Sequence, residues 1–323
     1  MSRLLSPYAL VSALAALPLM VAAPAAMAFA QDGHASHHQA GHQHAAFESD
    51  RIHVLVEGLE SGPDVVLIPG LSSSPRVWED TVARLSATHR LHLIHVNGFG
   101  GAPAEGNAQP GDEPSPFLVP VAEEIARYIR EGGLQKPSLI GHSMGGSLSM
   151  IIATRHPEAV SKVMVVDMLP FMGAMFGPPG TTAESVKPTA QNLWQMQSSI
   201  ARADYDAFAV NTINGMINTE SRREGALQDV YGSDQRTSAA AYYDLVVTDL
   251  RPDLPKFTGP MTVLYVKFND ARMTNEITDM IYGASFATRP ATTLKRIDNS
   301  AHFIMFDQPD VFAAEVDAFL TSN

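Results

Sequence analysis

Residues Leu139 to Met150 read LIGHSMGGSLSM, and this stretch decides the fold. An apolar, strand-like segment (PSLI) leads into it, and a helix-like segment (SLSMIIATRHP) follows. Between them, Gly141 to Gly145 match G-x-S-x-G, the pattern of a serine on a strained turn between a strand and a helix. The glycines relieve crowding at that turn, and the N-terminus of the following helix favours developing negative charge. The pattern therefore predicts that Ser143 is a catalytic nucleophile.

The alternative interpretation is a glycine-rich turn used only for packing or for binding phosphate. Neither G-x-G-x-x-G nor G-x-x-x-x-G-K-[ST] occurs in the sequence, which weakens the phosphate interpretation.

Short apolar runs and helix-like segments alternate along most of the chain. This alternation predicts an α/β protein with a doubly wound, mostly parallel sheet. The expected strands are Ile52–Val56, Val65–Ile68, Leu91–Val96, Ser138–Ile140, Lys162–Val166, Met261–Phe268 and Thr293–Ile297. The expected helices are Arg76–Ala87, Pro116–Glu131, Met144–His156, Met273–Tyr282 and Pro309–Leu320.

Residues 168–256 interrupt the alternation, because they show helical periodicity without a convincing strand. We expect a helical cap or lid here, inserted into an α/β core formed by residues 51–167 and 257–323. The insertion begins with a soft, apolar stretch that could line a substrate pocket or simply pack the cap onto the core. The candidate pocket residues are Met168, Leu169, Phe171, Met172, Met175 and Phe176.

A serine nucleophile needs a general base, and the chain offers 12 histidines. Most lie in the N-terminal tract or on early strands. His142 adjoins the nucleophile but should point away from it. His156 follows at the far end of the same helix, roughly 20 Å away at 1.5 Å of rise per residue. His302 lies after the last expected strand, at the edge where the sites of parallel sheets assemble, so it is the predicted base.

The carboxylate that orients the base has two candidates. Asp270 follows the penultimate strand, and it is preferred because it gives the chain order Ser, Asp, His. Asp167 follows the strand before the insertion and is the alternative. Either could instead cap a helix.

The negative charge that develops on the substrate oxygen needs two donors. One should be the backbone N–H of Met144, directly after the nucleophile. The other should be the N–H of Leu71, in the loop PGLSSSPRVW, where Gly70 allows close backbone approach.

With these residues placed, the chain resembles the α/β-hydrolase superfamily from Arg51 to its end. The matching segments are VVLIPGLSSSPRVWED, HVNGFGGAP, LIGHSMGG, VLYVKFNDA and SAHFIMFDQPDVF, in the family's order. The resemblance is strongest to lidded esterases and lipases with a G-H-S-M-G-G elbow. It implies a Ser143–Asp270–His302 triad, an oxyanion hole at Leu71 and Met144, and a helical lid.

The sequence thus predicts a serine hydrolase that cleaves a small-molecule carboxylic ester with a lipophilic acyl or aromatic group, without metal or organic cofactor. Its base must be neutral, so activity should rise with pH as the histidine loses its proton. A lactonase, a carbon–carbon bond hydrolase and a cofactor-free haloperoxidase could use the same residues. A non-catalytic binding protein is an alternative from another class.

The first residues suggest export. Arg3, an apolar stretch and A-x-A sites are typical of a signal peptide over residues 1–30, cleaved near Ala28 or Ala30. We therefore expect a bacterial periplasmic or secreted protein with no stable membrane span. Residues 31–50 contain a histidine-rich tract, which we expect to be a disordered linker; a metal-binding tract is the alternative.

Composition limits the partners and the chemistry. The net charge of −12 becomes −13 without the segment that holds Arg3, which disfavours nucleic acid and anionic membranes. The chain has no cysteine, so disulfides and thiolate chemistry are excluded.

Overall fold

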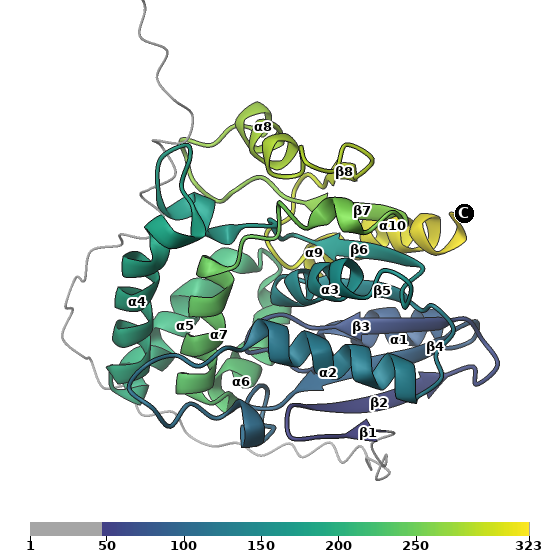
Figure 1. Cartoon of the computed structure of the whole chain (residues 1–323), viewed down its shortest axis with the longest axis horizontal. Helices are drawn as coiled ribbons and strands as arrows, with labels where there is room; N and C mark the ends of the chain where they lie inside the picture. The colour runs from purple at the N-terminus through teal and green to yellow at the C-terminus, as the bar shows by residue number, and fades with distance from the viewer. Residues whose placement is uncertain (1–46, 323) are drawn as a thin grey trace, which may run out of the picture.

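The structure is a computed structural model that describes residues 47–322. It contains an 8-stranded sheet of order β1-β2-β4-β3-β5-β6-β7-β8 (Figure 1). The strands β3 to β8 are parallel, whereas β1 and β2 pair antiparallel at one edge. The predicted α/β fold class is therefore confirmed. The strands are β1 (Phe47–Glu48), β2 (Ile52–Gly58), β3 (Asp64–Ile68), β4 (Arg90–Val96), β5 (Ser138–His142), β6 (Lys162–Val166), β7 (Met261–Tyr265) and β8 (Thr293–Arg296).

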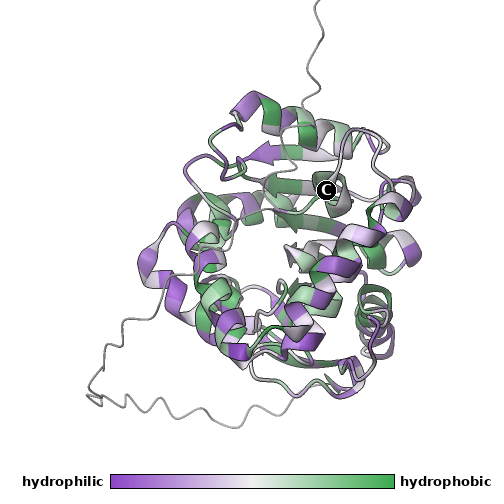
Figure 2. Cartoon of the chain, turned by 90° about the vertical axis from the view of Figure 1, so that its left-hand side faces the viewer, coloured by the Kyte–Doolittle hydropathy of each residue, from purple (hydrophilic) through white to green (hydrophobic). Residues whose placement is uncertain are grey.

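The central strands are apolar on both faces because helices cover both faces. Every residue of β5 is buried, and β3 and β6 are buried except at their first residue. Figure 2 shows the same arrangement, with hydrophobic colours on the central strands and mixed colours on the helices around them.

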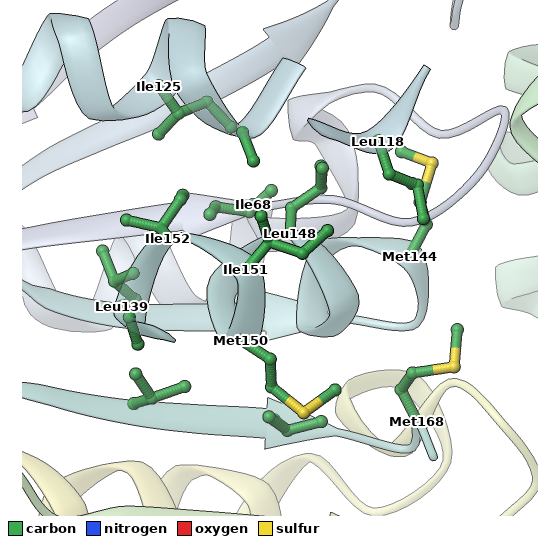
Figure 3. Close-up of a cluster of buried hydrophobic side chains, with 14 of the residues drawn as sticks. Ile68, Leu118, Ile125, Leu139, Met144, Leu148, Met150, Ile151, Ile152 and Met168 are labelled. Atoms are coloured by element: carbon green, nitrogen blue, oxygen red, sulfur yellow. The ribbon is translucent and has the colours of Figure 1, made fainter. Parts of the chain in front are cut away.

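Two helical layers enclose the sheet. One core cluster joins it to α2 (Leu118–Glu131), α3 (Met144–Arg155) and α8 (Asn275–Ser285). Figure 3 shows the part of this cluster around α2 and α3. A second core cluster, on the other face, includes side chains of α1 (Glu79–Leu85), α9 (Ile304–Asp307) and α10 (Pro309–Thr321). Each layer therefore shields one apolar face of the strands.

The chain between β6 and β7 forms the helical insertion, which lies beside the ends of the parallel strands (Figure 1). Its α-helices are α4 (Ala183–Ser199), α5 (Arg202–Met216), α6 (Arg223–Gly232) and α7 (Gln235–Val247).

Two carboxylates attach the insertion to the core. Asp229 in α6 accepts hydrogen bonds from the Ser74 backbone N–H at 2.9 Å and the Ser74 hydroxyl at 2.8 Å. Asp244 in α7 accepts from the backbone N–H groups of Phe117 and Leu118, at 2.9 and 2.8 Å. This second contact caps the N-terminus of α2, where unpaired N–H groups favour a negative charge.

The N-terminal edge differs from the expected boundary. Phe47 and Glu48, assigned above to the linker, form β1, because Phe47 packs on Tyr128 with ring centroids 5.1 Å apart. The Arg127 guanidinium lies 4.7 Å from the centre of the same ring. The predicted signal peptide and residues 31–46 lie outside the described residues. Within residues 47–322, no helix is long and apolar enough to cross a membrane.

Candidate active site

Ser143 occupies the turn between β5 and α3 with φ 53° and ψ −121°. A non-glycine residue in this conformation costs about 1–3 kcal/mol, and such strain is concentrated at functional sites. The Ser143 backbone N–H donates to the carbonyl of Val166 at 2.8 Å, which fixes the turn against β6. Within residues 47–322, its hydroxyl makes no hydrogen bond to another residue, His302 included.

The neighbouring glycines leave no room for a side chain. A Cβ on Gly141 would lie 2.1 Å from the carbonyl oxygen of Gly145, and one on Gly145 would lie 2.1 Å from that of Ile68. Both contacts are with backbone, which cannot move aside without disrupting β3 or α3. The glycine spacing seen in the sequence is therefore a steric requirement of the turn.

His302 lies on the loop between β8 and α9, and its Nδ1 is 2.7 Å from Oδ2 of Asp167. The carboxylate sits directly after β6 and its side chain is only 9% exposed, against 20% for His302. An Nδ1–H donated to Asp167 leaves Nε2 as the acceptor, which is the form a general base needs.

The other carboxylate oxygen of Asp167 is also occupied. Oδ1 accepts from the Tyr282 hydroxyl at 2.9 Å and from the Val266 backbone N–H at 3.1 Å. Burial, with the Asp167 charge as a further cause, raises the pKa of Tyr282 well above 10, so this hydroxyl stays protonated as a donor. Tyr282, which the sequence analysis did not single out, therefore completes the support of the carboxylate.

Asp270, the preferred acid in the sequence analysis, does not contact His302. Its carboxylate binds the Arg272 guanidinium and backbone N–H, and these hydrogen bonds lower its pKa to about 2. Because Asp270 lies beyond the end of β7 at Tyr265, the intervening loop carries it away from the strand edge. The carboxylate beside the histidine belongs to Asp167, the alternative, which follows Val166 of β6 without any intervening residue.

His142, set aside above as a candidate base, supports the site in another way. It is buried, its Nε2 lies 3.1 Å from the carbonyl oxygen of His302, and the two rings are 4.6 Å apart. Burial lowers its pKa well below 6.5, so the ring is neutral and can donate Nε2–H to that carbonyl. His142 thus supports the loop that carries His302.

The loop after β3 passes directly against the elbow. A Cβ on Gly70 would lie 3.1 Å from the Cβ of Ser143. Leu71 follows Gly70, and Met144, fully buried, begins α3 (Figure 3). Among residues 47–322, neither the Leu71 nor the Met144 backbone N–H donates a hydrogen bond to another residue. Two free amides are therefore available near the serine.

The six candidate pocket residues divide into two groups. Met168 and Leu169 are buried in the main core cluster. Phe171 is also buried, and the Arg251 guanidinium lies over its ring, 4.6 Å from the ring centre. Met168 and Leu169 therefore pack the start of the insertion onto the core, whereas Phe171 packs against Val186, Ala190 and Val246 within the insertion. The other three are partly exposed and also pack against these clusters: Met172, Met175 and Phe176.

No group of three or more potential metal ligands occurs within the described residues. The histidine-rich tract lies outside them.

Residues 65–315 match the model of the alpha/beta hydrolase family. A pimeloyl-[acyl-carrier protein] methyl ester esterase from Aeromonas hydrophila is 32% identical over 118 residues, which span 36% of this chain and 42% of the relative. The same type of esterase from Vibrio atlanticus is 25% identical over 84% of this chain and 98% of its own length.

Solved structures share the fold. A hydrolase from Pseudomonas aeruginosa superposes with a TM-score of 0.69 at 15% identity, covering 88% of this chain and 100% of that chain. An enol-lactonase from Burkholderia xenovorans superposes with a TM-score of 0.65 at 18% identity, covering 84% and 96%.

Proposed function

Because this chain belongs to the alpha/beta hydrolase family, we propose that it is a serine hydrolase that cleaves carboxylic esters with Ser143, His302 and Asp167. The observation that carries the proposal is the 2.7 Å contact between His302 Nδ1 and Asp167 Oδ2, next to a serine held in a strained elbow. That contact orients the imidazole and stabilises its charged form during the reaction.

The proposed reaction has two halves. Ser143 Oγ attacks the ester carbonyl carbon while Nε2 of His302 takes the hydroxyl proton, and the amides of Leu71 and Met144 stabilise the resulting oxyanion. Collapse of the intermediate breaks the carbon–oxygen bond, and His302 protonates the leaving alcohol. Water, deprotonated by His302, then attacks the acyl-enzyme and releases the carboxylic acid and free Ser143.

The proposed substrate is an ester with an apolar acyl or aromatic group. Support comes from the partly exposed Met172, Met175 and Phe176 at the start of the insertion. Flexible thioether side chains adapt to apolar groups of varied shape. The names of the relatives, which are methyl ester esterases, also favour a small alcohol as the leaving group.

A lactone is the second candidate substrate. It is a cyclic ester and would need no catalytic group beyond those above, and the enol-lactonase of similar fold makes it worth testing.

The first experiment measures hydrolysis of p-nitrophenyl esters of graded chain length by the wild-type protein and by Ser143→Ala, with a set of lactones in parallel. Turnover that disappears in Ser143→Ala supports the proposed nucleophile, and the preferred chain length sizes the pocket. Activity that survives in the variant would refute the proposal, as would the absence of turnover with both substrate classes.

We also propose that the protein is exported, on the strength of Arg3, the apolar stretch after it and the A-x-A sites. Expression of the full chain in a Gram-negative bacterium, followed by mass spectrometry of the periplasmic fraction, tests this. We expect an N-terminus just after Ala28 or Ala30. An intact N-terminus in the cytoplasm would contradict export.

A further inference from the structure

The loop that carries Leu71 contains a turn with an unusual residue. The Ser73 backbone N–H donates to the Gly70 carbonyl at 3.3 Å, and Ser72, the third residue of this turn, has φ 53°. A β-turn whose third residue has a positive φ normally has glycine or asparagine as that third residue, because a left-handed conformation is costly for other residues. A serine persists there only if its surroundings hold it in place.

Side chains of the insertion surround the Ser72 hydroxyl. Ser72 Oγ and Ser238 Oγ are 2.8 Å apart, and both residues are buried. Ser238 lies in α7. Tyr205, from α5, lies near the two serines: burial raises its pKa, and Ser238 and Ser72 oppose the rise. The contact between Ser72 and Ser238 therefore joins a core loop to the insertion.

We propose that Ser238 is a positioning residue for the oxyanion hole. Its hydrogen bond holds Ser72 in the left-handed conformation and so sets the direction of the neighbouring Leu71 amide. The inference rests on the proposed function and deepens it, because the oxyanion hole then requires the docked insertion. Asp229 anchors the far end of the same loop at Ser74, but it does not contact the Ser72 hydroxyl.

The test compares Ser238→Ala with a matched control on the same helix. Thr237 is also buried, but its hydroxyl donates to the Asn107 carbonyl at 3.3 Å and not to the loop that carries Leu71. We expect Ser238→Ala to lower kcat about tenfold and change KM less than about twofold, because the lost hydrogen bond matters most when the oxyanion forms. Thr237→Val should keep kcat within about twofold of the wild-type value.

A rescue variant separates positioning from general damage. Glycine adopts a left-handed conformation freely, so adding Ser72→Gly to Ser238→Ala should recover most of the lost kcat. Tyr205→Phe provides a milder second variant and should lower kcat less than Ser238→Ala does. Thermal melting of every variant checks that each is folded.

Two further readouts make the result decisive. A trifluoromethyl ketone, which forms a tetrahedral adduct with the serine, should bind Ser238→Ala about tenfold more weakly. The rate at which a fluorophosphonate labels Ser143 should fall similarly. Labelling of Ser238→Ala at the wild-type rate would overturn the inference while leaving the proposed function intact. Equal losses in Thr237→Val, or no recovery with Ser72→Gly, would also overturn it. A wild-type protein that fails to label would remove the proposed function, and the inference with it.

Discussion

At the residue scale, the Asp167 carboxylate accepts hydrogen bonds from three donors. Its position directly after β6 explains why these donors meet at this carboxylate. The Ser143 N–H donates to the Val166 carbonyl, so Ser143 and the residue after Val166 leave adjacent strands side by side. Asp167 itself adopts φ 54°, a second strained residue at the same edge. His302, Tyr282 and Val266 then supply one hydrogen bond each to its two oxygens.

Substitution of Asp167 and of Asp270 tests which carboxylate orients His302. We expect Asp167→Asn to lower kcat by about 10³- to 10⁴-fold, because an amide no longer stabilises the charged imidazole or fixes its tautomer. Asp270→Asn removes a carboxylate bound to Arg272 alone among nearby side chains and should change kcat less than about twofold. The measurement is the steady-state kcat of both variants and the wild-type protein on one ester. The reverse ranking would return the role of acid to Asp270.

Tyr282 offers a finer test of the same carboxylate. Tyr282→Phe removes one of two donors to Asp167 Oδ1 and should lower kcat about 5- to 10-fold. Tyr265→Phe is the matched control, since this ring stacks on Tyr282 with centroids 4.1 Å apart but its hydroxyl donates to Asp279. If Tyr265→Phe reduces kcat equally, the effect is one of packing and not of hydrogen bonding.

Ser143 and His302 could be selected as candidates from the sequence because each has a local signal, a glycine-flanked turn or a loop after the last strand. The carboxylate that contacts His302 has no such signal: chain order favoured Asp270, whereas Asp167 lies beside His302 in the structure. The number of residues past the strand was the available clue. Asp167 follows β6 directly, whereas a loop separates Asp270 from β7. The supporting contacts of His142 and Tyr282 were not predicted because their partners are distant in sequence.

At the element scale, the apolar runs located the strands to within a few residues, because strands buried on both faces must be apolar throughout. Met261–Phe268 was predicted too long: the strand ends at Tyr265, and the chain then turns towards Asp270. The two-residue β1 was missed because so short a segment has no periodicity. Its strand pairing and the contact of Phe47 with Tyr128 define it, and both are tertiary.

The elbow leads to a prediction about α3. Gly145→Ala should destabilise the protein by about 3 kcal/mol or more, since the added Cβ would meet the Ile68 carbonyl oxygen at 2.1 Å. Gly283→Ala in α8 is the control. Nothing lies within 4 Å of its added Cβ, so it should stabilise by about 0.5–1 kcal/mol. Urea unfolding of both variants gives the comparison, and a stable Gly145→Ala protein would contradict the described packing.

At the scale of the whole molecule, buried histidines should make the fold sensitive to mild acid. Burial lowers the pKa of His92, His95 and His142 below 6.5. As the pH falls through 6.5, the unfolded chain binds protons that the folded chain does not, so the free energy of unfolding decreases. We expect the melting temperature to fall between about pH 7 and about pH 5.5, before most carboxylates titrate.

The dependence of melting temperature on pH in a histidine variant shows whether that histidine causes the acid sensitivity. His92 contacts the Tyr128 hydroxyl at 2.6 Å and Asp64 at 2.9 Å. His92→Gln should be less stable at neutral pH, yet its melting temperature should depend less on pH over the same range. An unchanged pH dependence would show that other groups cause the acid sensitivity.

The insertion leaves the core after β6 and returns at β7, and these two strands are neighbours in the sheet. Such an arrangement is modular: one cap could be exchanged for another without altering strand order or register. Ser238 and Asp229 of the insertion contact Ser72 and Ser74 in the loop after β3. A transplanted cap must therefore provide equivalents of these two side chains. Diversification of substrate range by cap replacement would thus be coupled to retention of those few contacts.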